Sequence, residues 1–237
     1  MSEPRINWRG LRAAGRGLRY AWKAQASWGW LPLAAALGLV LLFVLDEGFR
    51  DPGDPPHTAD LAFLVEVCLP LALALLLARV PVLDRESGAS ELHLTWRLPA
   101  PLYLLRLATV PLIAWAGAGA LLLLAAHWLY TPIDLCLALD MGLYPSLALG
   151  GATMAGSALA RHQVGGVVTS ALWWSVDLLK PGALHRWGHL FPYFRPLGID
   201  PEPLHLQALA VGALGLALAL WLSDRRERWV SGTSPSD

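Results

Sequence analysis

Residues 80–101 read VPVLDRESGASELHLTWRLPAP, a polar stretch between two strongly apolar segments. Each flanking segment is hydrophobic enough to cross a bilayer, so the stretch is expected to be a short loop at the membrane surface. Within it, Ser90 can cap a helix start, Glu91 suits the first turn, and Pro99 is a stop signal. Spanning a membrane does not require such a helix, which indicates that the loop contacts something in the water.

The composition of the whole chain is typical of a membrane protein. Of its 237 residues, 55% are hydrophobic and only 15% are charged. The formal net charge is zero, which gives no indication of nucleic-acid binding. Cys68 and Cys136 are expected at different depths and are interpreted as structural thiols rather than as a disulfide.

Apolar runs predict how the chain is organised. A membrane-spanning helix needs about 20 apolar residues. Six runs approach this length, which predicts an all-α, polytopic membrane protein with spans at residues 28–45, 61–80, 105–128, 143–160, 164–179 and 204–223. This six-span domain (residues 28–223) would follow an N-terminal segment, residues 1–27, and precede a tail, residues 224–237. No signal-peptide pattern comes before the first run, so the N-terminus is expected to be retained.

Basic residues predict the orientation. With both termini in the cytoplasm, most of the 18 Lys and Arg residues fall on inner segments, and Arg50, Lys180, Arg186 and Arg195 fall on outer ones. Cytoplasmic loops carry such an excess of basic residues. The prediction is therefore a multi-pass protein of the inner (cytoplasmic) membrane, with the 80–101 loop inside the cell.

The N-terminal segment is expected to form an amphipathic helix in the headgroup layer. Apolar and basic residues recur there at spacings of three and four, which on a helix gives adjacent stripes: Trp8, Leu11, Leu18 and Trp22, and Arg9, Arg12, Arg16, Arg19 and Lys23. Such a helix meets lipid phosphates with its basic stripe. It would either fix the topology or steer the first span beside a partner.

Within the spans, two acidic residues and one ridge of small residues stand out. An ionisable group inside a span is costly and usually has a purpose. Glu66 and Asp177 are therefore candidates for a transport path, with pairing to Lys180 or Arg186 favoured for Asp177. The ridge of Ala152, Gly156 and Ala160 is expected to pack within the chain rather than between chains.

Residues 180–202 form an outer segment rich in prolines and aromatic residues, which argues against one continuous span. Its aromatic residues, including Trp187, Phe191, Tyr193 and Phe194, are expected at the outer membrane interface. His185 and His189 have a metal-ligand spacing, but no matching third ligand is nearby, so no metal site is predicted.

The loop also resembles a known pattern. Glu86, Gly88, Glu91, Leu92 and Pro99 follow the order and spacing of the intracellular loop of ABC-2 type ABC transporter permeases. The chain length, the N-terminal helix, the six spans and the re-entrant outer segment (residues 180–202) resemble that family too. One position departs from the pattern: the family usually has a basic residue about ten positions after the proline, where this chain has Thr109, with Arg106 one turn earlier.

The resemblance implies that residues 80–101 are a cytoplasmic coupling helix seated in the cleft of an ATPase. Leu92 and Trp96 would be its apolar anchors, and charged contacts would come from Arg85, Glu86, Glu91 and Arg97. The chain has no G-x-x-x-x-G-K-[ST] motif, so ATP and Mg would bind to a separate cytoplasmic ABC ATPase dimer and no cofactor to this chain. A second permease chain, identical or homologous, would complete the exporter.

Two other classes of function stay open. A non-transporting membrane scaffold or assembly subunit would have the same helices but gives no reason for the loop. An intramembrane enzyme would need clustered catalytic groups. The chain has serines in its spans but no histidine at depth, and it lacks an H-E-x-x-H motif.

Overall fold

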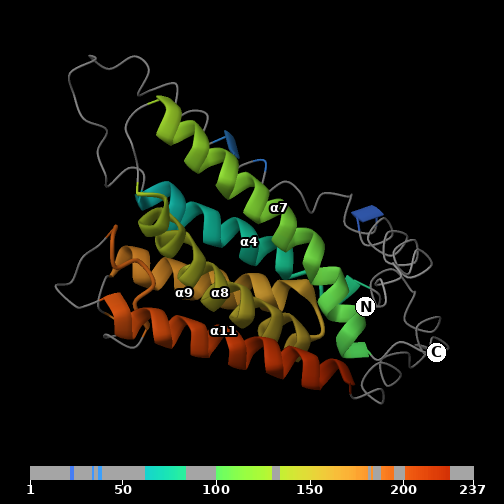
Figure 1. The fold of residues 1–237 in the computed structure, drawn as a ribbon. Coiled ribbons are helices and arrows are strands. Elements are labelled where there is room, and N and C mark those ends of the chain that lie inside the picture. The colour runs from blue at the N-terminus through green and yellow to red at the C-terminus, as the bar shows by residue number, and fades with distance from the viewer. Residues whose placement is uncertain are drawn as a thin grey trace, which may run out of the picture.

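The computed structural model describes residues 22–23, 34, 37–38, 62–83, 100–129, 134–180, 183, 188–194 and 201–224. The secondary-structure elements in these ranges are all helices: η2 (Phe63–Cys68), α4 (Leu69–Leu77), α7 (Ala100–Leu129), α8 (Leu135–Ala160), α9 (Gln163–Leu179) and α11 (Pro201–Asp224). The prediction of an all-α protein is confirmed for this part of the chain. Figure 1 shows the helices lying along one common direction.

The helices match the predicted apolar runs, with one early start. α7, α9 and α11 contain the predicted runs 105–128, 164–179 and 204–223, and η2 with α4 lies within 61–80. α8 begins before residue 143 because the Asp134 carboxylate accepts hydrogen bonds from the backbone N–H groups of Cys136 (2.9 Å) and Leu137 (3.2 Å). These bonds satisfy donors that a helix N-terminus leaves open.

Two described helices are long and apolar enough to cross a membrane, over Pro101–Leu124 and Pro201–Ser223, and Phe63–Leu77 is a shorter apolar helix. Six spans are not evident in the described residues, and of the first predicted run only residues 34, 37 and 38 are described. In the α11 window only 22% of the residues are buried. Leucines such as Leu206 and Leu214 point outward, 69% and 71% exposed. Apolar surface of this extent is typical of contact with lipid or with a partner.

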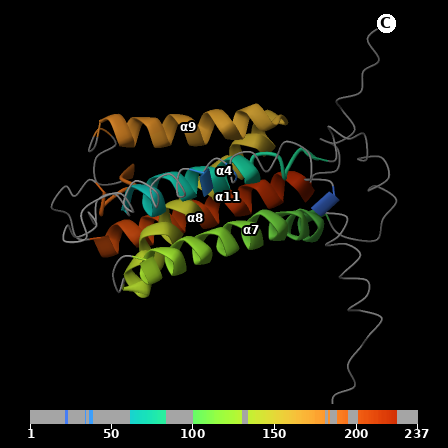
Figure 2. The ribbon, with the colours of Figure 1, turned by 90° about the horizontal axis from the view of Figure 1, so that it is seen from above.

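α8 is the central helix of the bundle. It packs on α4, α9 and α11, while α7 packs on α4 and α11. Figure 2 shows α9 and α7 on opposite sides, with α4, α8 and α11 between them. A sharp turn joins α8 to α9: Arg161 adopts the left-handed conformation (φ 55°), and the His162 Nδ1 accepts a hydrogen bond from the Val164 N–H.

Glycines bring the backbones of α8 and α11 into direct contact. A Cβ atom on Gly212 would lie 2.6 Å from the carbonyl oxygen of Leu147, and one on Gly151 would lie 2.7 Å from the Cα of Gly212. Likewise, a Cβ atom on Gly156 would lie 2.9 Å from the carbonyl oxygen of Gly165 in α9. The ridge around Gly156 therefore packs inside the chain, as expected from its spacing.

Successive helices run in opposite directions, so the bundle has two distinct ends (Figure 1). η2, α8 and α11 begin at one end, where α7 and α9 finish; we call it the cap end because it holds residues 188–194, the cap segment. At the other end, the loop end, α4 finishes and α7 begins. There Leu77, Val80 and Leu83 pack against Leu104 and Leu107.

Candidate functional site

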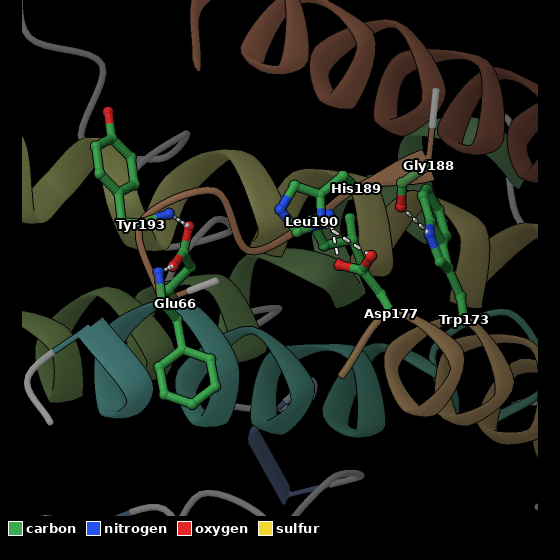
Figure 3. A network of polar contacts seen from close by, with 8 residues as sticks. Glu66, Trp173, Asp177, Gly188, His189, Leu190 and Tyr193 are labelled. Atoms are coloured by element: carbon green, nitrogen blue, oxygen red, sulfur yellow. Dashed lines mark hydrogen bonds and ion pairs between the residues drawn. The ribbon is translucent and has the colours of Figure 1, made fainter. Parts of the chain in front are cut away.

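The two acidic residues singled out in the sequence are both fully buried at the cap end, and both hold the cap segment. Glu66 is 0% exposed and Asp177 is 1% exposed. Figure 3 shows the two carboxylates pointing toward the cap segment from η2 and from α9. Glu66 and Asp177, which are far apart in the sequence, thereby bind the same segment.

Among the described residues, the hydrogen-bond partners of Glu66 are backbone groups. Its Oε1 accepts a hydrogen bond from the Tyr193 N–H at 3.1 Å, and its Oε2 accepts one from the Phe194 N–H at 2.6 Å (Figure 3). A carboxylate has lone pairs enough for both donors, and the short distance to Phe194 is typical of a charge-assisted bond. Glu66 thus satisfies two backbone donors at the C-terminal end of the cap segment.

Asp177 is bound by the backbone and by an imidazole. Its Oδ1 lies 2.9 Å from the Nδ1 of His189, and its Oδ2 accepts a hydrogen bond from the Leu190 N–H at 2.7 Å. One turn earlier on α9, the indole N–H of Trp173 donates to the carbonyl oxygen of Gly188 at 2.8 Å. The partner of Asp177 is therefore His189, not the predicted Lys180, which is exposed at the end of α9; Arg186 lies outside the described residues.

The helix that carries Glu66 is a π-helix, and α9 supports it. The backbone N–H of Leu69 reaches back to the carbonyl oxygen of Leu64, five residues earlier. The indole N–H of Trp174 donates to the carbonyl oxygen of Val67 at 3.0 Å. A π-turn widens the helix and disturbs the usual pairing of its carbonyls. Trp174 supplies a donor at this place and fixes α9 against η2.

The cap segment also inserts an apolar plug. Phe191 is 0% exposed and packs with Leu190 among Val67, Ala148 and Leu149. The prediction that this aromatic run lies at the membrane interface is wrong for Phe191, because its ring is enclosed by protein. Tyr193 and Phe194 are partly exposed, and Trp187 lies outside the described residues.

A small hollow adjoins Glu66 between η2, α8, α11 and the cap segment. Its empty volume is about 240 Å³ with open solvent included, and its polar or ionisable lining consists of Glu66, Asp140, Tyr144, His189, Tyr193 and His205. The rings of Tyr144 and His205 stack at 4.0 Å. Burial raises the pKa of the Tyr193 phenol, and the charges of Asp140 and Glu66 raise it further, so this phenol stays neutral.

The other predicted site residues lie outside the described ranges: Arg85, Glu86, Gly88, Glu91, Leu92, Trp96, Arg97 and Pro99. Among the described residues, no three His, Cys, Asp or Glu side chains are placed to hold a metal ion. What the cap end can do chemically is hold a backbone segment, or release it when a carboxylate takes up a proton.

Sequence reasoning missed the cap segment as the partner of both acids. The sequence predicts no metal site at His189 and offers no other partner for it, and Glu66 binds backbone groups that carry no side-chain identity. One sequence feature could have pointed to these contacts: Trp173, Trp174 and Asp177, three residues with polar groups, lie close together in one apolar run. In the structure all three make polar contacts outside α9.

The chain was compared with models of protein families, with curated proteins and with solved structures, and none of the three comparisons gave a match.

Proposed function

We propose that this chain is a membrane-spanning permease subunit of an ABC-2 type, ATP-driven exporter. It would work with a separate cytoplasmic ATPase dimer and with a second permease chain, identical or homologous. The proposal includes six spans with both termini in the cytoplasm. Described helices overlap the second to sixth apolar runs, and of the first run only residues 34, 37 and 38 are described.

The observation that carries the proposal is the charge difference between the two ends of the bundle. At the loop end, the described charged residues are mainly basic: Arg79, Arg106 and Arg161, with one acid, Asp224. At the cap end they are mainly acidic: Glu66, Asp134, Asp140, Asp177 and Glu202, with one base, Lys180. Membrane proteins keep Lys and Arg in short loops on the cytoplasmic side. This supports an orientation with the loop end in the cytoplasm.

The course of the chain brings the ABC-2-like pattern to that same end. α4 finishes and α7 begins at the loop end (Figure 1), and the ABC-2-like pattern lies in the sequence between these two helices. An ATPase working in the cytoplasm would meet the loop there, and the cap segment would close the far side. A scaffold would account for the helices but not for this combination of loop pattern and charge.

The test replaces one apolar anchor and one charge in the loop. If Trp96 fills a pocket of the ATPase, Trp96→Ala should cost about 2 kcal/mol of binding, a roughly thirtyfold loss of affinity. Glu91→Lys should disturb docking by reversing a contact charge. Co-purification with the partner ATPase, and ATP turnover, should fall together.

Glu202→Lys is the matched control, because it reverses a charge in the first turn of α11 at the cap end. It should leave ATPase binding intact. Normal ATPase binding and turnover in both loop variants, at normal abundance in the membrane, would contradict the permease proposal and favour a scaffold.

A further inference from the structure

The two carboxylates that anchor the cap segment, Glu66 and Asp177, differ in one chemical respect. Glu66 is held by two backbone N–H groups, whose charge never changes. Asp177 is held by one backbone N–H and by the imidazole of His189, which can take up a proton. The two anchors therefore respond differently when protons are added.

Protonation weakens the Glu66 anchor. A neutral carboxyl group has one O–H, which donates rather than accepts, so it no longer offers two full acceptors to two converging N–H groups. Hydrogen bonds to a neutral acceptor are also weaker than bonds to a charged one. The amides of Tyr193 and Phe194 would lose at least one of their two short contacts.

Protonation of His189 strengthens the Asp177 anchor. Imidazole is the side chain that ordinarily titrates between about pH 5 and about pH 8. Once protonated, both of its ring nitrogens are donors, and the contact between Nδ1 and Oδ1 becomes an ion pair in which both partners are charged. The Leu190 amide keeps its acceptor as long as Asp177 remains ionised. Acidification thus loosens one end of the segment while it tightens the other.

The hollow is the nearest open space to Glu66, which is one of its lining residues although it is 0% exposed. The titratable groups that face this region come from every element around it: Asp140 and Tyr144 from α8, His205 from α11, Asp177 from α9, and His189 and Tyr193 from the cap segment itself. A proton that enters the hollow meets Glu66 without crossing the apolar core around Phe191.

We propose that the cap segment is a proton-sensitive strap that is released at Glu66 and retained at Asp177. Release would free Tyr193 and Phe194 beside the hollow, while Gly188 to Leu190 stay on α9. The inference concerns contacts within this chain, so it stands or falls independently of the proposed transport function.

Amide hydrogen exchange on the unmutated protein in lipid nanodiscs tests the strap directly. Exchange at Leu190, Tyr193 and Phe194 would be measured from about pH 8 to about pH 5 and divided by the intrinsic rate of the unstructured peptide at each pH. Protection at Tyr193 and Phe194 should fall about tenfold or more as the pH is lowered. Protection at Leu190 should stay constant or rise.

Two variants separate the anchors. Glu66→Gln should abolish the pH dependence and leave Tyr193 and Phe194 weakly protected throughout, with Leu190 still protected. Asp177→Asn should expose Leu190 and leave the pH response of Tyr193 and Phe194 in place. The proposal is overturned if the three amides of the unmutated protein lose protection together as the pH is lowered, or if none of them responds to pH. Both outcomes are measured on the unmutated protein, so they do not depend on whether either variant folds.

Discussion

The contact between α8 and α11 and the contact between the cap segment and its two anchors hold the bundle by opposite means. In the first, glycine backbones touch with no room for a methyl group. In the second, buried carboxylates accept hydrogen bonds from a segment that has little helix of its own. Shape alone determines the first contact, whereas charge determines the second.

This difference indicates which contacts can change while the protein functions. A backbone-on-backbone contact has one fitting arrangement, because close-packed interiors do not deform gradually. A carboxylate contact has at least two states, since one proton alters its acceptors. The cap end is therefore the chemically adjustable part of the bundle, and the contact between α8 and α11 is the fixed part.

The largest effect is expected from Gly212→Ala. The added methyl would collide with the backbone of Leu147, which can move only if α8 and α11 separate. Overpacking of this kind costs about 3 kcal/mol or more. Gly117→Ala is the control, because nothing lies within 4 Å of its Cβ position and alanine favours a helix by up to about 1 kcal/mol. Thermal unfolding in nanodiscs should separate the two variants clearly. Equal stability would show that the helices are not in backbone contact.

The next effect is expected from Glu66→Ala, which leaves two buried N–H groups without an acceptor. Each such loss costs about 1 kcal/mol at the lower end of the usual range, so the two together should cost about 2 kcal/mol. Asp134→Ala is a matched control, because Asp134 also accepts hydrogen bonds from two backbone N–H groups, but it is exposed. Water can replace its carboxylate, so the expected cost is about 1 kcal/mol. If denaturation gave Glu66→Ala the smaller cost, burial would not be what makes the cap contact strong.

A smaller effect is expected from Trp174→Phe. The variant keeps an aromatic ring beside Val67 but removes the indole donor, so the loss should be about 1 kcal/mol, that of one hydrogen bond. Trp221→Phe serves as the control, because this indole is half exposed on α11. A full loss of folding in Trp174→Phe would mean that the π-helix depends on this one donor.

The smallest effect is expected from Ser157→Ala. The Ser157 Oγ is buried and has no hydrogen-bond partner in the part of the chain that the structure describes, so its removal should change stability by less than about 0.5 kcal/mol or raise it slightly. Ser146→Ala is the comparison, because the Ser146 hydroxyl donates to the carbonyl oxygen of Gly142 at 2.5 Å. A marked loss of stability in Ser157→Ala would reveal a partner for this hydroxyl.

The helices were predictable, because long apolar runs leave few alternatives. The runs 164–179 and 204–223 agree with α9 and α11 to within a few residues. α8 was predicted too short because Asp140 interrupts its apolar pattern before residue 143, although Asp140 lies within the helix. Pro145 also lies inside α8, where a proline removes one backbone hydrogen bond of the helix.

The candidate site was only half predictable. The cost of burying a charge singled out Glu66 and Asp177 from the sequence alone. Their partners could not be found in the same way, because three of the four donors to them are backbone N–H groups, which every residue except proline possesses. Whether either acid lines a transport path stays a prediction.

The π-helix has a consequence for any residue-by-residue scan of this region. Over Phe63–Cys68 the chain makes fewer turns per residue than an α-helix, so the phase of the side chains slips by roughly 100° before α4 begins. A helical wheel drawn through residues 62–83 with one constant period therefore places Glu66 on the wrong side relative to Leu73 and Leu77. Periodic accessibility in a cysteine scan should advance regularly along α4 and then jump by one position near Cys68.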